Sequence, residues 1–326
     1  MSTLRALKRK CNVDVTIPKN FWTTLEISFK IVDLGKCRYV PPEQSKTDYD
    51  MGGASTLKLG LIGDNIAASR APDLHRIAGR LNNMDVQYDR LIPKELNQTF
   101  DQIFESCPDK GYQALNITYP YKENVVSKVT IDDPMVRAIA AVNTVVFNGT
   151  SSKAYNTDYT GFIAAYEQVR LGANPGVCCL LGTGGVGRAL AFGLVNLGAD
   201  EIRLFDRDSA KAQKLAHDLN VLEPQTVVTA VDDLNAATAN CDGLLNGTPV
   251  GMVGYPGSAF EPTAIAQAAW VFDAVYTPIE TMFLQCAKAA GAQIISGYEL
   301  FFFQGVHAWR HFSGRDVDKQ KLRAAL

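Results

Sequence analysis

One glycine-rich segment limits the fold of this chain more than any other feature of its 326 residues. Residues 181–187 read LGTGGVG, follow a continuous apolar stretch and precede the helical pattern of residues 188–197. In such a strand, loop and helix unit, Gly182 permits a tight turn, Gly184 lets the backbone approach a pyrophosphate, and Gly187 lets helix and strand pack closely. The N-terminus of the helix then offers unpaired N–H groups to the phosphates. We therefore predict a dinucleotide site at Gly182, Gly184, Gly185, Val186 and Gly187.

The residues that follow the next predicted strand, 201–205, indicate which dinucleotide binds. Asp206 lies 24 positions beyond Gly182 (206 minus 182), where a carboxylate accepts hydrogen bonds from the ribose hydroxyls of NAD and repels the 2′-phosphate of NADP. The neighbouring Arg207 is either the kind of guanidinium that an NADP site uses or a solvated surface side chain. We predict NAD as the cofactor and keep NADP as the alternative.

Beyond residue 56, short apolar runs alternate with amphipathic stretches, which is typical of α/β domains. In the first half we expect strands at residues 57–62, 86–92, 112–117 and 142–147, and helices at residues 72–83, 96–106 and 122–129. In the second half we expect strands at residues 177–181, 201–205, 226–231, 243–246, 270–274 and 293–295. Helices at residues 159–171 and 299–312 would join the two halves.

These elements predict an α/β fold of two domains. An N-terminal α/β substrate-binding domain would comprise residues 57–158 and 298–326, because the last helix is apolar enough to return to it. A Rossmann-type dinucleotide-binding domain would comprise residues 159–297, since six strands suit that fold.

Residues 1–56 show no sustained helix or strand period, and we expect a peripheral leader, either disordered or absent from the native protein. One hypothesis is that Met51 is the true start, which the intact mass of the natively expressed protein would test. No apolar run of the length of a secretory signal follows the basic residues near the start, whereas an organellar transit peptide stays an alternative.

The charge and cysteine content limit which binding partners and which cellular compartment we expect. Lys and Arg number 32 against 34 Asp and Glu, so no basic surface for nucleic acid or an anionic membrane is indicated. A small-molecule substrate is the expected partner, for a monomer or a homodimer. Seven cysteines without a CxxC pair suit a reducing compartment, and no apolar run reaches membrane-spanning length, so we expect a cytoplasmic protein.

Three polar clusters in the first domain indicate a ligand-binding site. Residues 116–122 read NITYPYK, residues 141–144 read AVNT and residues 156–158 read NTD, near the strand ends where ligands of α/β proteins bind. Oxidation of a secondary alcohol needs a group that accepts the hydroxyl proton or stabilises alkoxide charge. Lys122 and Asp158 could share that task, or they could be a surface lysine and a helix N-cap. The pattern does not fix their protonation state.

The order of the motifs resembles the shikimate/quinate dehydrogenase family from about residue 59 to residue 314. The matching segments are the loop at residues 63–72, NITYPYK, AVNT, NTDYTGF, GTGGVG, NGTPVGM at residues 246–252, DAVYTP at residues 273–278 and the helix with Gln304. The resemblance implies that Lys122 and Asp158 are the catalytic pair. It implies substrate contacts from Ser69, Thr118, Asn143, Tyr276 and Gln304, and cofactor contacts from Asp206, Arg207, Thr248 and Gly297.

The biosynthetic enzymes of that family commonly use NADP and an Asn-Arg-Thr type of segment. Here residues 205–208 read FDRD, which resembles the NAD-using catabolic branch. We therefore expect NAD-dependent interconversion of shikimate and 3-dehydroshikimate, of quinate and 3-dehydroquinate, or of both.

One motif departs from the family. Its first loop usually carries two hydroxyl residues for the substrate carboxylate, whereas this chain has Ser69, Arg70, Ala71 and Pro72. The missing hydroxyl implies weaker carboxylate binding or a different substrate, unless Arg70 compensates. A dehydrogenase of a related ring acid, such as aminoshikimate, and a silent NAD-binding sensor stay alternatives. NTDYTGF and NGTPVGM argue against a methylenetetrahydrofolate dehydrogenase.

Three other features carry no functional expectation. His307 and His311 lie four positions apart on one helical run, but no third ligand accompanies them, so we predict no metal site. Residues 301–303, all Phe, indicate core packing, and Cys178 and Cys179 should be buried within a strand.

Overall fold

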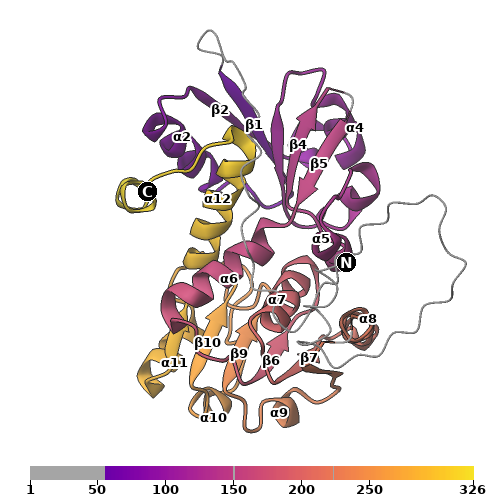
Figure 1. The fold of residues 1–326 in the computed structure, drawn as a ribbon. Helices are drawn as coiled ribbons and strands as arrows, with labels where there is room; N and C mark the ends of the chain where they lie inside the picture. The colour runs from indigo at the N-terminus through magenta and orange to yellow at the C-terminus, as the bar shows by residue number, and fades with distance from the viewer. Residues whose placement is uncertain (1–55, 150, 223) are drawn as a thin grey trace, which may run out of the picture. The chain divides into compact units, whose positions relative to one another are not determined.

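The computed structural model of the protein describes residues 56–149, 151–222 and 224–326. These residues belong to one compact unit, Gly35–Leu326. They form two β-sheets with helices packed on them, so the predicted α/β fold is confirmed (Figure 1). The leader expected at residues 1–56 lies outside the described residues apart from Thr56. None of the helices described is long and apolar enough to cross a membrane.

The first sheet has five strands in the order β2-β1-β3-β4-β5. Their bounds are β1 Leu57–Ile62, β2 Val86–Leu91, β3 Ala114–Ile117, β4 Thr144–Asn148 and β5 Ser151–Tyr155. Strand β1 runs parallel to β2 and β3, whereas β4 is antiparallel to both β3 and β5. Four of the five strands lie where the sequence predicts them. The fifth, β5, was not expected.

The helices of this part are shorter than expected. Their bounds are α2 Ala71–Leu81, α3 Pro93–Leu96, α4 Phe100–Ser106, the 3-10 helix η2 Asn124–Lys128 and α5 Pro134–Ile139. The helix expected at residues 96–106 begins only at Phe100, because Asn97 is left-handed with φ 49° and ends α3, and Thr99 and Gln102 form a capping box that starts α4. The helix expected at residues 122–129 is only a 3-10 helix, and α5 was missed.

The second sheet has six parallel strands in the order β11-β10-β9-β6-β7-β8. Their bounds are β6 Val177–Leu181, β7 Glu201–Phe205, β8 Val227–Ala230, β9 Gly243–Asn246, β10 Trp270–Asp273 and β11 Gln293–Ile295. The chain builds outward from β6 to one edge, then restarts at β9 and builds to the other. This is the strand order of a Rossmann fold, and ligands bind where the order reverses, beyond the ends of β6 and β9.

Five helices belong to the second sheet: α7 Gly185–Asn196, α8 Ser209–Asn220, α9 Leu234–Ala237, α10 Pro262–Ile265 and α11 Met282–Ala290. Helix α7 follows β6 directly through the glycine loop. The apolar strand β6 is buried, with Cys178 and Cys179 both 0% exposed, as the sequence predicts.

Two long helices connect the sheets, α6 Thr157–Arg170 and α12 Gly297–Ser313, and α13 Lys319–Ala325 ends the chain (Figure 1). Gly161 lets α6 and α12 touch, because a Cβ there would lie 2.7 Å from the backbone N of Gln304. Gly305 packs in the same manner on Leu74 of α2. Helix α12 therefore returns to the first sheet as predicted, and its phenylalanines, residues 301–303, are buried.

Candidate active site

The centre of the site is an ion pair between Lys122, which follows β3, and Asp158 at the start of α6. Nζ of Lys122 donates to Oδ2 of Asp158 over 2.7 Å, and the two side chains are only 12% and 9% exposed. Asn156, not Asp158, caps α6, because its Oδ1 accepts from the N–H of Tyr159. The alternative of a surface lysine and a helix-capping aspartate is therefore wrong.

Asn143 lies beside this pair. Its Oδ1 accepts from the backbone N–H of Thr157 at 2.7 Å, so the amide contacts the residue that precedes Asp158. Asn156 fixes the same segment from the other side, since its Nδ2 donates to the carbonyl of Ala141. Three segments that are far apart in the sequence thus bring an amide, a lysine and an aspartate together, as expected.

Three further predicted residues gather around the first turns of α12. Burial raises the pKa of Tyr276, although the Ser69 side chain and the charge of Arg70 oppose the rise. The ring of Tyr276 stacks on Phe301 with centroids 5.1 Å apart. Gln304 lies on the next turn and donates from Nε2 to the carbonyl of Phe301.

The loop that carries Ser69 packs on the segment that carries Lys122. A Cβ at Gly63 would overlap the methyl group of Thr118, and the hydroxyl of Tyr121 donates to Asp64 at 2.6 Å. Thr118 therefore lies directly under the first loop. Arg70, considered as a substitute for the missing hydroxyl, instead donates to the carbonyl of Leu326 after α13.

The glycine loop has the geometry that a dinucleotide requires. Gly182 has φ 92°, and a Cβ there would lie 2.6 Å from the methyl group of Thr248. A Cβ at Gly187 would overlap the carbonyl of Gly182, so helix and strand approach as closely as predicted. Gly184 is the N-cap of α7 and offers no side-chain cap, which leaves the first N–H groups of this 12-residue helix to a phosphate.

The same loop adjoins the ion pair. A Cβ added to Gly185 would lie 3.3 Å from Cδ of Lys122, so the lysine stem passes directly over the start of α7. The loop thus has the predicted lysine as its neighbour, although the two follow strands of different sheets. Val186 follows at the first turn of the helix and is partly buried.

Asp206 is bound to the glycine loop itself. Its Oδ2 accepts from the N–H and the hydroxyl of Thr183 at 2.8 and 3.0 Å, and its Oδ1 accepts from the N–H of Asp208. Partial burial raises the pKa of Asp206, but these hydrogen bonds outweigh it and the net pKa is lowered. The carboxylate is thus held in its charged form. Arg207 beside it is exposed.

Thr248 and Gly297 follow the carboxyl ends of β9 and β11. The hydroxyl of Thr248 donates to Oδ1 of Asn246, whose Nδ2 donates to Asp273. Asp273 is 0% exposed, and burial raises its pKa more than its hydrogen bonds from Thr281, Val275 and Asn246 lower it. Sequence reasoning missed this supporting carboxylate, although it opens the DAVYTP segment. Gly297 packs its Cα on the carbonyl of Val275.

Arg188 was also missed. It lies in the first turns of α7, is 6% exposed, and donates to the carbonyl oxygens of Ala138 and Ile139 at the end of α5. It also donates to Asp218 at 2.8 Å. The sequence feature that could have identified Arg188 is that it is a single charged residue in an otherwise apolar helical segment. This side chain joins the cofactor helix to the segment that leads into Asn143.

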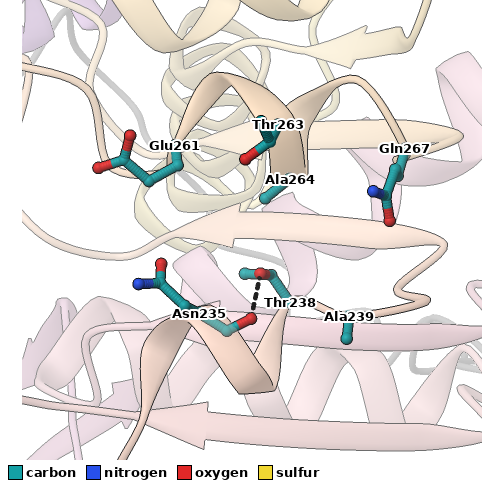
Figure 2. Close-up of a pocket in the computed structure, with 7 residues that line it drawn as sticks. All are labelled: Asn235, Thr238, Ala239, Glu261, Thr263, Ala264 and Gln267. Carbon is teal, nitrogen blue, oxygen red and sulfur yellow. Dashed lines mark hydrogen bonds between the residues drawn. The ribbon is translucent and has the colours of Figure 1, made fainter.

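Two surface hollows lie elsewhere. One, of about 280 Å³, is lined by residues of α9, α10 and their flanks, and Figure 2 shows its bond from the hydroxyl of Thr238 to the carbonyl of Asn235. The other, of about 240 Å³, lies between α2 and the end of the chain and includes Arg70. Neither includes Lys122 or Asp158.

The histidines singled out above have other roles in the structure. Nδ1 of His307 is 2.8 Å from the hydroxyl of Thr160, and His311 stacks on Tyr155 with centroids 3.7 Å apart. Across residues 56–149, 151–222 and 224–326, no group of three or more His, Cys, Asp or Glu side chains could hold a metal ion.

Comparison with protein families gives two matches. Residues 61–145 match the shikimate dehydrogenase substrate binding domain, and residues 177–243 match a family described as NADP oxidoreductase, coenzyme F420-dependent. The first match covers the segments with Thr118, Lys122 and Asn143, and the second covers the glycine loop and Asp206.

Individual relatives match more than four fifths of the chain. A quinate/shikimate dehydrogenase (NAD(+)) from Corynebacterium efficiens is 34% identical over 278 residues, 83% of this chain and 98% of the relative. A shikimate dehydrogenase (NADP(+)) from Pseudarthrobacter chlorophenolicus is 34% identical over 82% of this chain and 92% of its own length. The solved structure of quinate dehydrogenase from Corynebacterium glutamicum in complex with NAD is 32% identical, with a TM-score of 0.76 over 83% and 98% of the two chains. The chain belongs to the shikimate/quinate dehydrogenase family of oxidoreductases.

Proposed function

We propose that the protein is an NAD-dependent dehydrogenase that interconverts quinate and 3-dehydroquinate, shikimate and 3-dehydroshikimate, or both. The observation that carries the proposal is the buried Lys122–Asp158 pair directly beside Gly185 of the glycine loop. A proton-handling pair next to a dinucleotide loop is what oxidation of a secondary alcohol requires. We assign the substrate to residues 57–158 and 298–326 and the cofactor to residues 159–297.

The cofactor assignment rests on Asp206. A carboxylate that its hydrogen bonds keep charged favours ribose hydroxyls over a 2′-phosphate, which would meet a like charge. The relatives include enzymes named for NAD and for NADP, so Arg207 keeps NADP as a second cofactor. Gly182, Gly184, Gly185, Val186 and Gly187 would hold the pyrophosphate, with Thr248 and Gly297 nearby.

When bound, the cofactor supplies a hydride acceptor. The protein's task is then to hold the alcohol and remove its proton as the hydride leaves. Lys122 and Asp158 share that proton, because their 2.7 Å hydrogen bond lets charge gained at Nζ be balanced by the carboxylate. Their low exposure keeps water away from this bond, which strengthens it relative to a surface pair.

The remaining predicted residues would orient the substrate. Asn143, Thr118 and Gln304 would hold ring hydroxyls, and Ser69 with Tyr276 would hold the carboxylate end. Their arrangement supports this division, since Ser69 acts on the hydroxyl of Tyr276, whereas Asn143 accepts a hydrogen bond from Thr157, the residue before Asp158.

A second candidate is a dehydrogenase of a related ring acid, such as aminoshikimate. The observation that favours it is Ala71, which is buried at the start of α2 and offers the carboxylate no hydroxyl. In the structure one donor of the Arg70 guanidinium is bound to Leu326.

One experiment separates these candidates. Initial rates of nicotinamide reduction are measured with quinate, shikimate and aminoshikimate, each with NAD and with NADP. Turnover of quinate or shikimate with a preference for NAD is the expected result. Preference for aminoshikimate would favour the second candidate, and silence with all three acids would refute both and leave an NAD-binding protein without this catalysis.

A further inference from the structure

The amide of Asn143 has a defined orientation. Oδ1 accepts from the backbone N–H of Thr157 at 2.7 Å, and a backbone N–H can only donate, so the oxygen must face Thr157. Nδ2 donates to no acceptor among the residues that the structure describes. The amide therefore offers two N–H donors to whatever binds beside Asp158.

A line of buried polar groups leads to this amide from the core of the first sheet. The hydroxyl of Tyr88 donates to Oδ1 of Asn116 at 2.8 Å, which turns Nδ2 of Asn116 toward Oγ1 of Thr144 at 3.4 Å. Burial raises the pKa of Tyr88 far above its ordinary value, so this hydroxyl keeps its proton. Because Thr144 accepts from Asn116, its own proton is available to Oδ1 of Asn143, 3.0 Å away.

The donors and acceptors around Oδ1 of Asn143 show how the Thr144 hydroxyl takes part in holding the amide. Oδ1 of Asn143 has two lone pairs, of which the N–H of Thr157 takes one. The hydroxyls of Thr144 and Thr157 both lie within 3.1 Å of Oδ1 and of each other. Thr144 is 0% exposed, and the acceptors within reach of its single hydroxyl proton are Oδ1 of Asn143 and Oγ1 of Thr157, so it donates to one of these two.

We propose that Thr144 is a positioning residue, which holds the Asn143 amide with its N–H groups toward the substrate without touching the substrate itself. The proposal deepens the proposed function and rests on it for the identity of the substrate. Without the Thr144 hydroxyl, one of the two hydroxyls beside Oδ1 is lost and Asn116 loses an acceptor, so the hydrogen-bond network that holds the amide is weaker and the amide samples other rotamers.

The kinetic test is a double-mutant cycle with Thr144→Val, which keeps the shape and removes the hydroxyl, and Asn143→Ala. We expect Thr144→Val to lower kcat/KM about five- to tenfold, the size of one buried hydrogen bond, mainly through KM. In the Asn143→Ala background the same change should have less than about a twofold effect. Thr144→Ser should restore activity. Equal losses in both backgrounds would show a general structural effect and overturn the proposal.

Thr238→Val is the matched control. Thr238 is a buried threonine whose hydroxyl donates to a backbone carbonyl of α9, far from Asn143 along the chain. It should leave kcat/KM unchanged. The affinity for NAD, measured by calorimetry, should be the same in wild type and in both Thr→Val variants.

A second readout does not depend on the substrate. In ¹⁵N-labelled protein, the Asn143 side-chain N–H signals, assigned by their loss in Asn143→Ala, should be two sharp resonances. Thr144→Val should broaden or shift them, whereas Thr238→Val should not. Unchanged signals in Thr144→Val would overturn the positioning role. If wild type turned over none of the ring acids, the proposed function would fail alone, and these signals would still decide the role of Thr144.

Discussion

Nζ of Lys122 lies 2.7 Å from Oδ2 of Asp158, although the two residues are 36 positions apart and belong to a loop after β3 and to the start of α6. The aliphatic stem of Lys122 also lies against Gly185, so this side chain contacts both Asp158 and the glycine loop. The proposed chemistry follows from this double contact.

Replacing Lys122 should separate catalysis from cofactor binding. We expect Lys122→Ala to lower kcat about 10²- to 10⁴-fold, because the hydroxyl proton loses its acceptor. The affinity for NAD should change little, since the phosphates are held by the backbone of the glycine loop. Calorimetry and initial rates measure the two effects. Lys128→Ala, which removes a more exposed lysine paired with Glu105, is the control. Near wild-type turnover of Lys122→Ala would refute its role.

Removing the Asp206 carboxylate should change the choice of cofactor. In Asp206→Ala the ribose loses an acceptor, the 2′-phosphate loses a repulsive charge, and Thr183 loses its partner. We expect weaker NAD binding and a ratio of kcat/KM for NAD over NADP that falls about tenfold or more. Asp200→Ala, at the surface of the same sheet, should leave that ratio unchanged. An unchanged ratio in Asp206→Ala would contradict the assignment of Asp206 to the cofactor ribose.

Restoring a hydroxyl at position 71 should strengthen binding of the substrate carboxylate. The N–H of Ala71 donates to Oγ of Ser69 at 3.3 Å, so the two positions are close neighbours in the loop. We expect Ala71→Ser to lower KM for quinate and shikimate about two- to tenfold, the contribution of one hydrogen bond. Ala68→Ser, exposed in the same loop, should have no effect. A raised KM in Ala71→Ser would indicate that this space serves a different substrate.

Three histidines should make the protein sensitive to mild acid. Burial lowers the pKa of His75 to about 3, and it lowers the pKa of His307 and of His311 to about 4. From the ordinary value of 6.5 down to about 4, the unfolded chain therefore binds protons that the folded protein does not. Stability is then complete above about pH 6.5 and falls as the pH decreases through that range.

Urea unfolding between pH 7 and pH 4.5 measures this dependence. His311→Phe keeps the stacking on Tyr155 but cannot be protonated, so its free energy of unfolding should fall less steeply with decreasing pH than that of wild type. The exposed His217 offers a control, since His217→Phe should leave the slope unchanged. Identical slopes for wild type and His311→Phe would contradict the role of His311.

The part of the fold that the sequence predicts best is the second sheet. Its strands are buried on both faces and read as continuous apolar runs, as in Val177–Leu181, so their bounds are clear. The glycine loop could be predicted equally well, because each of its glycines is required for a separate steric reason. The pairing of Lys122 with Asp158, by contrast, rested on family resemblance, since spacing alone left a surface lysine as an equal alternative.

The parts of the fold that could not be predicted are short or polar elements. Strand β5 reads SSKAY and buries only Ala154, so it shows no apolar period, and it exists because β4 offers an edge for pairing. Helix α5 has six residues, too few for a helical pattern, although Asp133 followed by Pro134 is a start signal. The contacts of Thr144 and Asp273 join segments far apart in the chain, which no local pattern reveals.

Arg188 limits how the two halves of this protein can be recombined. A cofactor domain grafted from a relative without a matching guanidinium would leave the carbonyl oxygens of Ala138 and Ile139 without their donor. Conversely, this cofactor domain moved to another partner would carry a charged group that is buried here. A substitution at Asp206 leaves these bonds of Arg188 in place, whereas exchange of the whole domain breaks them.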